Sequence, residues 1–255
     1  MKYNYHTHTY RCRHALGQDR EYVEAAIAAG VEEMGFSDHA PLRFPDGFEA
    51  GYRMLTDSAE EYVRSINALK KEFAGKIRLH VGYEMEYYPA YFSEMLAFAK
   101  SLGVEYFILG QHFFIDERSS KPSGWENDSE ADLKIYVDRV IEGMETGAYT
   151  YVAHPDLLHF TGAEEIYVRE IRRLCAAAKR TNTPLEINFL GIRTNRFYPH
   201  DKFWELAGEA GAPVVVGYDA HEPKDAGDNE SYVRANELIE KYRLNYLEKP
   251  ELRFI

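Results

Sequence analysis

Seven of the ten histidines in the chain lie at or just after the end of an apolar run that predicts a β-strand. Glu84 and Asp219 occupy the same kind of position. Imidazoles and carboxylates are common protein ligands of zinc and the neighbouring transition metals. If the strands are parallel, their carboxyl ends meet on one face and bring these side chains together. The residues in this group are His6, His8, His14, His39, Glu84, His112, His154, Asp219 and His221.

The spacing within two of these motifs favours a shared ion. In His6-Thr7-His8 the two imidazoles are two residues apart on a strand, so they point to the same face, about 6.5–7 Å apart along the chain. Two such imidazoles can converge on one ion, since zinc–nitrogen bonds are about 2.0–2.1 Å long. Asp219-Ala220-His221 repeats this arrangement, and a carboxylate such as Glu84 can bridge two ions. The pattern predicts more than one ion at this face.

Arg193 is the candidate for binding a phosphate. It follows the predicted strand 185–188 and is therefore expected on the same face, where its planar donor fork would suit a phosphate. Pairing with a nearby carboxylate is the alternative. His159 is expected to be a solvated loop residue or a substrate contact, whereas His80 is expected to pack inside a strand and His200 to be exposed. Glycine-rich loops of the nucleotide-binding type are absent.

The elements that must position these residues alternate along the chain. Amphipathic runs between the strands predict helices: Ser58 with Glu61 predicts a capping box, Pro89 and Ser129 begin two further helices, and Gly103 ends one. The alternation predicts an α/β fold with a mostly parallel sheet, and seven units favour a closed or nearly closed barrel over an open doubly wound sheet. The predicted strands are 3–6, 33–37, 77–83, 106–110, 149–153, 185–188 and 214–217.

Length and composition predict one globular domain over residues 1–255, because a single α/β barrel commonly has about 250 residues. A net charge of −12 opposes binding to long nucleic acids or to an anionic membrane. Two cysteines and the lack of an apolar signal segment predict a soluble, cytoplasmic protein. The irregular stretches 40–57 and 116–128 are long enough to be active-site loops. The sequence does not indicate an oligomeric state.

Taken together, these motifs resemble the PHP (polymerase and histidinol phosphatase) superfamily, and most closely its histidinol-phosphatase branch, to which Tyr52-Arg53-Met54 also points. Two departures are Gly110-Gln111, where Ser-Val is often found before the histidine, and Tyr218, where serine is common. The matching segments, in family order over nearly the whole chain, are 6–9, 14–17, 35–41, 82–84, 110–113, 153–156, 186–188 and 219–221.

The resemblance implies a distorted (β/α)7 TIM-like barrel with a metal site at the carboxyl ends of the strands. It also implies up to three divalent ions of zinc, iron or manganese, with Asp38 and Asp156 as candidates to orient the imidazoles. Carried over by position, the first ion is held by His6, His8, Glu84 and Asp219, the second by Glu84, His112 and His154, and the third by His14, His39 and His221.

The function that the resemblance implies is a metal-dependent phosphomonoesterase acting on L-histidinol phosphate in histidine biosynthesis, with a metal-bound hydroxide as nucleophile. Arg193 and His159 would contact this small phosphorylated substrate, and Asp219 or His221 would pass a proton to the leaving alkoxide. The alternatives are a PHP phosphoesterase acting on nucleotides or other small phosphate esters, hydrolysis at a carbon centre, and a non-catalytic metal-stabilised module.

Overall fold

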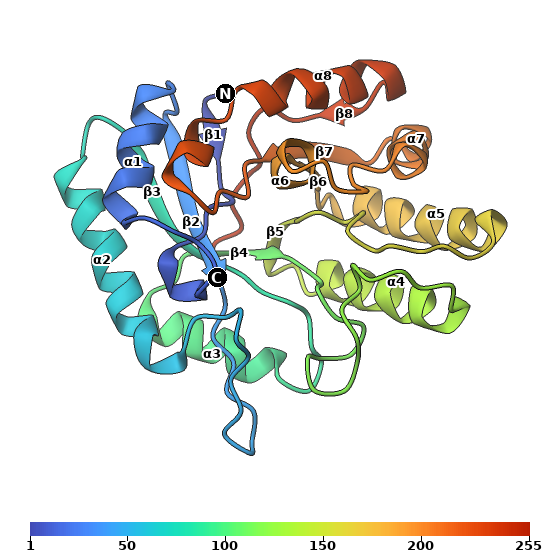
Figure 1. Cartoon of the computed structure of the whole chain (residues 1–255), viewed down its shortest axis with the longest axis horizontal. Helices are drawn as coiled ribbons and strands as arrows, with labels where there is room; N and C mark the ends of the chain where they lie inside the picture. Colours follow the sequence, from blue (N-terminus) through green and yellow to red (C-terminus); the bar gives the residue numbers. More distant parts are fainter.

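A computed structural model describes residues 1–255, and its centre is one sheet of eight strands (Figure 1). The strands pair in chain order and every pairing is parallel. The seven predicted strands and the α/β class are confirmed, and β8 is an additional short strand. The strands are β1 (Tyr3–Asn4), β2 (Glu33–His39), β3 (Arg78–Glu84), β4 (Tyr106–Leu109), β5 (Tyr149–Val152), β6 (Leu185–Asn188), β7 (Pro213–Gly217) and β8 (Asn245–Tyr246).

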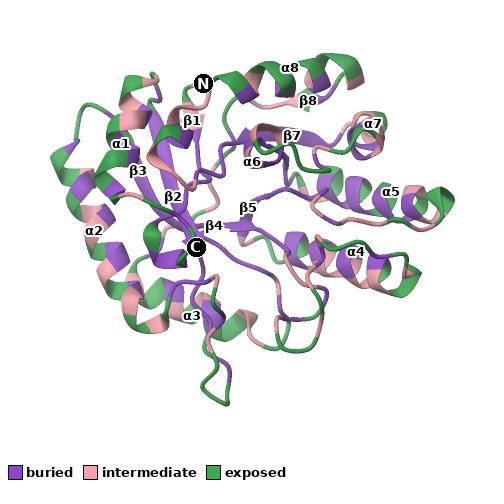
Figure 2. Cartoon of the chain, viewed as in Figure 1, coloured by how far each residue is buried: buried purple, intermediate pink, exposed green.

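Helices connect the strands and cover the outside of the sheet (Figures 1 and 2). Every residue of β2, β4, β5, β6 and β7 is buried, as expected for parallel strands covered on both faces. No helix combines the length and the apolar character needed to cross a membrane. The helices are α1 (Asp19–Ala28), α2 (Ala59–Glu72), α3 (Phe92–Leu102), α4 (Glu130–Glu145), α5 (Glu164–Thr181), α6 (Phe189–Arg193), α7 (Asp201–Ala210) and α8 (Glu230–Tyr242).

The predicted helix boundaries are confirmed in part. The Ser129 side chain caps α4 by accepting a hydrogen bond from the Asp132 amide, and Gly103 ends α3 with a φ of 79°. The helix after Pro89 begins only at Phe92. The capping box at Ser58 is wrong, because a 3-10 turn (Thr56–Ser58) leads directly into α2 and the serine side chain makes no capping hydrogen bond.

The sheet curls into a TIM-like half-barrel whose first and seventh strands meet at the carboxyl end. Thr7, just after β1, forms a parallel bridge with Ala220, just after β7. The His8 amide donates to the Ala220 carbonyl at 2.9 Å, and on the other side the Ser37 amide donates to the Thr7 carbonyl at 2.8 Å. At the opposite end, β8 pairs with β7 instead.

Tyr106 fills the inside of the curled sheet and limits what its neighbours can be. Its side chain is fully buried, and its hydroxyl donates to the Tyr5 carbonyl at 2.9 Å. A Cβ atom added at Gly35 or Gly82 would overlap the Tyr106 side chain. Glycine at these two positions is therefore required for β2 and β3 to pass the ring.

We predict that Gly82→Ala destabilises the fold by about 1–3 kcal/mol, because the buried Tyr106 ring has no free space to move into. Gly51→Ala is the control: a Cβ there has nothing within 4 Å, and its effect should stay within about 0.5 kcal/mol. Urea unfolding followed by circular dichroism measures both. Equal unfolding midpoints for Gly82→Ala and the unmodified protein would contradict this packing.

Candidate metal centre

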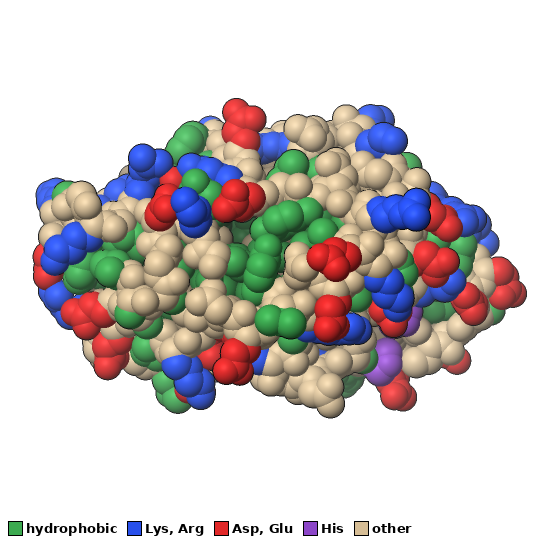
Figure 3. All heavy atoms as spheres, turned by 90° about the horizontal axis from the view of Figure 1, so that it is seen from above, with side chains coloured by type: hydrophobic (Ala, Val, Ile, Leu, Met, Phe, Trp, Pro, Cys, Tyr) green, Lys and Arg blue, Asp and Glu red, His purple; other side chains and the backbone are tan.

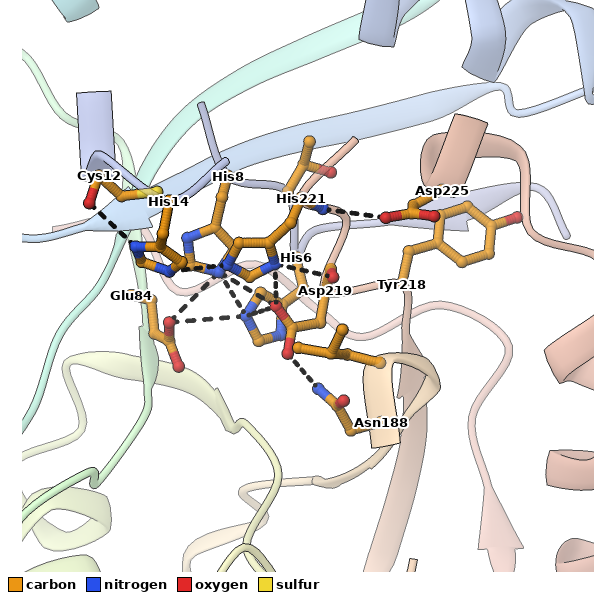
Figure 4. Close-up of polar contacts among 12 residues, drawn as sticks. His6, His8, Cys12, His14, Glu84, Asn188, Tyr218, Asp219, His221 and Asp225 are labelled. Carbon is orange, nitrogen blue, oxygen red and sulfur yellow. Dashed lines mark hydrogen bonds and ion pairs between the residues drawn. The ribbon is translucent and has the colours of Figure 1, made fainter. Parts of the chain in front are cut away.

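The nine candidate ligands lie together at the carboxyl end of the curled sheet, and Figure 4 shows several of them converging. Eight of them belong to groups of three whose ligand atoms are all within 4.8 Å of one another. The ninth is His112, whose Nε2 lies 3.4 Å from Glu84 Oε1. These groups are His6–Glu84–His154, His6–His8–Asp219, His8–His39–Glu84 and His14–His39–His221, and a fifth group joins Cys12 to His8 and His221.

Glu84 is the centre of one half of the cluster. Its carboxylate is 1% exposed, with Oε1 at 2.7 Å from His154 Nε2 and Oε2 at 3.0 Å from His39 Nδ1. Burial opposes ionisation, but the imidazoles around it, led by His112, hold the pKa of Glu84 well below its usual value. The surrounding imidazoles therefore favour the ionised carboxylate of Glu84, the form in which it can bridge two metal ions.

Asp219 is the centre of the other half. Its Oδ1 lies 3.2 Å from both His8 Nε2 and His221 Nδ1. Both Asp219 and His154 have positive φ, at 46° and 31°, which residues other than glycine rarely adopt. Such conformations cost on the order of 1–3 kcal/mol and concentrate at functional sites. The backbone is strained where it aims these two side chains into the cluster.

The carboxylates around His6 favour a positive charge at this position. Burial alone would lower the pKa of His6, but Glu186, Asp219 and Glu84 together raise it to about 10. Its Nε2 faces His8 Nε2 at 3.2 Å, and its Nδ1 is 2.8 Å from Glu186. The same carboxylates would stabilise a metal ion bound by the two imidazoles.

The His14–His221 pair offers lone pairs to a shared ion. Desolvation, followed by repulsion from His221 and His8, lowers the pKa of His14 to about 4, so this imidazole is neutral near pH 7. Its Nδ1 is 2.9 Å from the Cys12 carbonyl and so carries the hydrogen, leaving a lone pair on Nε2. That atom lies 3.0 Å from His221 Nε2.

Several buried polar atoms of the cluster lack a hydrogen-bond partner, which usually costs free energy. Coordination of an ion would satisfy those that face the cluster, among them Glu84 Oε2 and Asp219 Oδ1. This chemistry, of imidazole and carboxylate donors, fits divalent transition metals. The unpartnered atoms are His8 Nδ1, His39 Nδ1, Glu84 Oε2, His154 Nδ1 and Asp219 Oδ1.

Two buried carboxylates that the sequence analysis did not single out hold ligands in place. Glu186 accepts from His6 Nδ1 at 2.8 Å and from the His154 amide at 3.0 Å. Glu86 accepts from His112 Nδ1 at 2.9 Å. The sequence contained a signal for each. Glu186 is a glutamate inside an otherwise apolar buried strand, and Glu86 lies two residues after Glu84, on the same side of the chain.

The two aspartates expected to orient imidazoles have different contacts. Asp38 Oδ1 lies 3.6 Å from His8 Nδ1, and its other oxygen accepts from the Thr9 hydroxyl. Asp156 instead accepts from the His200 amide at 2.8 Å and from Trp204 Nε1 at 2.9 Å. The expectation for Asp156 is therefore wrong: its Oδ2 holds the start of α7, and its Oδ1 has no hydrogen-bond partner, so neither oxygen orients an imidazole.

Arg193 does not reach the site, contrary to the sequence analysis. Its guanidinium donates to the carbonyls of Tyr218 and Asp219 at 2.7 and 2.6 Å and faces Asp225 and Asp228. These contacts turn it away from the ligands, so it supports the turn that carries Asp219.

The other three histidines also lie away from the cluster. His159 stacks on Phe197, with ring centroids 4.1 Å apart, and does not line the cavity above the cluster. His80 packs between Glu33 and Glu105, as expected, at the opposite end of β3. His200 is exposed at the start of α7, also as expected.

A cavity of about 570 Å³ opens above the ligands. The two irregular segments predicted as site loops supply part of its wall: Tyr52 comes from one, and Trp125 from the other. Arg196 is the one lysine or arginine among the lining residues. The lining residues other than the candidate ligands are Gly51, Tyr52, Phe113, Pro122, Gly124, Trp125, Leu157, Leu190, Arg196 and Tyr198.

Similar proteins share this architecture. A protein named as a probable histidinol-phosphatase of Deinococcus radiodurans is 32% identical over 232 residues, covering 87% of each chain. The histidinol-phosphatase of Bacillus subtilis is 26% identical over 254 residues, covering 87% of this chain and 94% of that protein.

Among solved structures, the histidinol phosphate phosphatase of Lactococcus lactis, complexed with zinc, L-histidinol and phosphate, has the same fold. It superposes with a TM-score of 0.73 at 23% identity and covers 100% of this chain and 98% of its own. The family match itself is to the PHP domain and extends over residues 4–189, which include seven of the nine candidate ligands. The chain belongs to the PHP domain family.

Proposed function

We propose that the protein is a metal-dependent phosphomonoesterase that hydrolyses L-histidinol phosphate. The observation that carries the proposal is a cluster of nine candidate imidazole and carboxylate ligands, eight of which line a cavity with an arginine and aromatic side chains in its walls. The names of the relatives in Deinococcus radiodurans and Bacillus subtilis support the substrate, as does the pair of ligands in the Lactococcus lactis structure.

The proposed metals are up to three divalent ions of zinc, iron or manganese. Bound there, they would supply a water acidic enough to act as nucleophile near neutral pH. The compact group His14–His39–His221 supports the ligand set inferred for the third ion, and His6–His8–Asp219 supports most of that for the first. Glu84, between His154 and His112, would connect the first ion with the second.

Arg196 replaces Arg193 in this proposal as the residue that binds the phosphate. It lines the cavity, and its Nη1 donates to the Tyr198 hydroxyl at 3.0 Å, which leaves other N–H groups for a substrate. A guanidinium there would stabilise the negative charge that develops on the phosphoryl oxygens. Asp219 and His221 also line the cavity, and either can pass a proton to the leaving alkoxide.

Aromatic walls favour a leaving group that carries a flat ring, as histidinol carries an imidazole. Tyr52 and Phe113 stack with ring centroids 5.7 Å apart, and Trp125, 64% exposed, adds a third ring. These rings would also accept a nucleobase, so a mononucleotide is the second candidate substrate. Long nucleic acids are not favoured: the net charge is −12, and acidic and basic side chains are interspersed over the face in Figure 3.

Histidinol phosphate should be hydrolysed with a kcat/KM at least tenfold above that for any mononucleotide, equivalent to about 1.4 kcal/mol of transition-state preference. Phosphate release from a panel of monoesters, assayed with each candidate metal, measures this. A tenfold preference for a mononucleotide would identify the second candidate as the substrate. A lack of turnover with every ester and metal would indicate a non-catalytic module.

Protein purified without chelator should contain more than one transition-metal ion per chain, by elemental analysis. Removal of the metal should abolish turnover and lower Tm, because Glu84 and Asp219 would then be buried with no metal cation between the imidazoles. Reloading should restore both properties. One ion or fewer per chain after reloading would contradict the assignment of three metal sites.

Arg196→Ala should lower kcat/KM by about 10²–10³, the usual effect of losing one donor to the transition state, and should leave metal content unchanged. Arg196→Lys should restore activity only in part, since an ammonium keeps the charge but loses the planar fork. Arg193→Ala is the matched arginine variant, and its main effect should be a lower Tm. If Arg193→Ala impairs turnover without a fall in Tm, and Arg196→Ala leaves turnover unchanged, then Arg193 binds the phosphate, as expected from the sequence.

A further inference from the structure

Arg53 is a buried cation that joins the two irregular segments around the cavity. It belongs to the segment 40–57, and its side chain is 1% exposed. Its Nη1 donates to the Ala40 carbonyl at 3.0 Å, within the same segment. Its Nε donates to Glu117 at 2.8 Å, in the segment 116–128. One guanidinium therefore fixes the relative position of both segments.

The same guanidinium contacts the carboxylate that holds a metal-ligand candidate. Arg53 Nη2 lies 2.7 Å from Glu86 Oε2, and the other oxygen of Glu86 accepts from His112 Nδ1 at 2.9 Å. The side chains of Glu86 and Glu117 are 0% and 3% exposed, so both contacts of Arg53 are shielded from solvent. The imidazole of His112 is connected to both segments through two charged groups.

Stability alone does not account for this arrangement. Two buried charges seldom gain more free energy from each other than they lose in leaving water, and apolar side chains of similar volume are often as stable. What the ions add is connection, since one guanidinium contacts two carboxylates at once, Glu86 at 2.7 Å and Glu117 at 2.8 Å. These contacts connect Tyr52, in the cavity wall, and Glu117 with His112, beside Glu84.

We propose that Arg53 is a positioning residue that couples metal binding at Glu84, His112 and His154 to the order of both cavity segments. Metal binding fixes His112, and through Glu86 and Arg53 it stabilises the segments that carry Tyr52 and Trp125. The coupling is reciprocal: ordered segments strengthen metal binding by the same factor by which metal binding favours the ordered segments. This inference rests on the proposed metal site and not on the identity of the substrate.

The test compares Arg53→Met with the unmodified protein by two measurements that need no substrate. Zinc affinity is measured by competition with a chelator, and hydrogen exchange is followed in 40–57 and 116–128 with and without zinc. Arg53→Met should weaken the binding of one zinc ion by about 10–100-fold, the usual effect of removing a group that supports a ligand. Zinc should then no longer protect either segment. Arg53→Lys should recover part of the affinity, but not the protection of 116–128, because it cannot hold both carboxylates.

Glu33→Gln is the matched control. Glu33 is a buried carboxylate with the same kinds of partner, His80, Arg78 and Lys249, at the opposite end of the sheet. The Glu33→Gln substitution should lower Tm without changing zinc affinity or the protection of either segment by zinc. Equal losses of zinc affinity in Glu33→Gln and Arg53→Met would overturn the proposal, because the effect would then be general destabilisation.

Glu117→Gln is a second variant that keeps the pair between Arg53 and Glu86. Zinc should still protect 40–57 in this variant and should protect 116–128 less. Unchanged zinc protection of both segments in Arg53→Met, or in Glu117→Gln if Arg53→Met does not fold, would also overturn the proposal. A protein that binds zinc and shows the expected losses but hydrolyses no ester would refute the proposed function and support the coupling.

Discussion

The bridge between Thr7 and Ala220 is the contact on which the ligand cluster depends. Each of these residues is the middle of a ligand motif, with His6 and His8 on either side of one and Asp219 and His221 on either side of the other. Residues on either side of an extended strand position point to the same face, which aligns His6 with His8. In the other motif, the left-handed φ of 46° at Asp219 turns the chain so that its carboxylate meets His8 and His221. The bridge sets the register between the two motifs, and a slip of one residue would separate them.

Register at the next pair of strands adds the remaining half of the cluster. β2 and β3 pair so that His39 lies beside Glu84, and the chain after β4 and β5 contributes His112 and His154 around the same carboxylate. Favourable packing elsewhere must offset the cost of gathering these groups. The apolar, fully buried strands supply that offset, since their side chains pack against a ring of helices (Figure 2).

The strands and the clustering of the candidate ligands could be predicted from the sequence because both depend on local patterns. Val214-Val215-Val216 is apolar enough to be a buried strand in any context, and His6-Thr7-His8 has its spacing whatever surrounds it. Arg193 and Arg196 could not be ranked, because the choice depends on the Tyr218 and Asp219 carbonyls, which are distant in sequence. The expectation for Asp156 was wrong for the same reason, because its partners lie at the start of α7, distant in sequence.

Glycine at position 110 has a consequence for how such a site can evolve. A Cβ atom there would overlap the carboxylate of Glu84, which the surrounding imidazoles hold in place. Gly217 has the same relation to Glu186. In each pair, one volume is shared between two residues, so a side chain at the glycine position requires the carboxylate to move. A lineage that acquires a side chain at 110 must also move the carboxylate at 84, and such pairs are expected to vary together across related sequences.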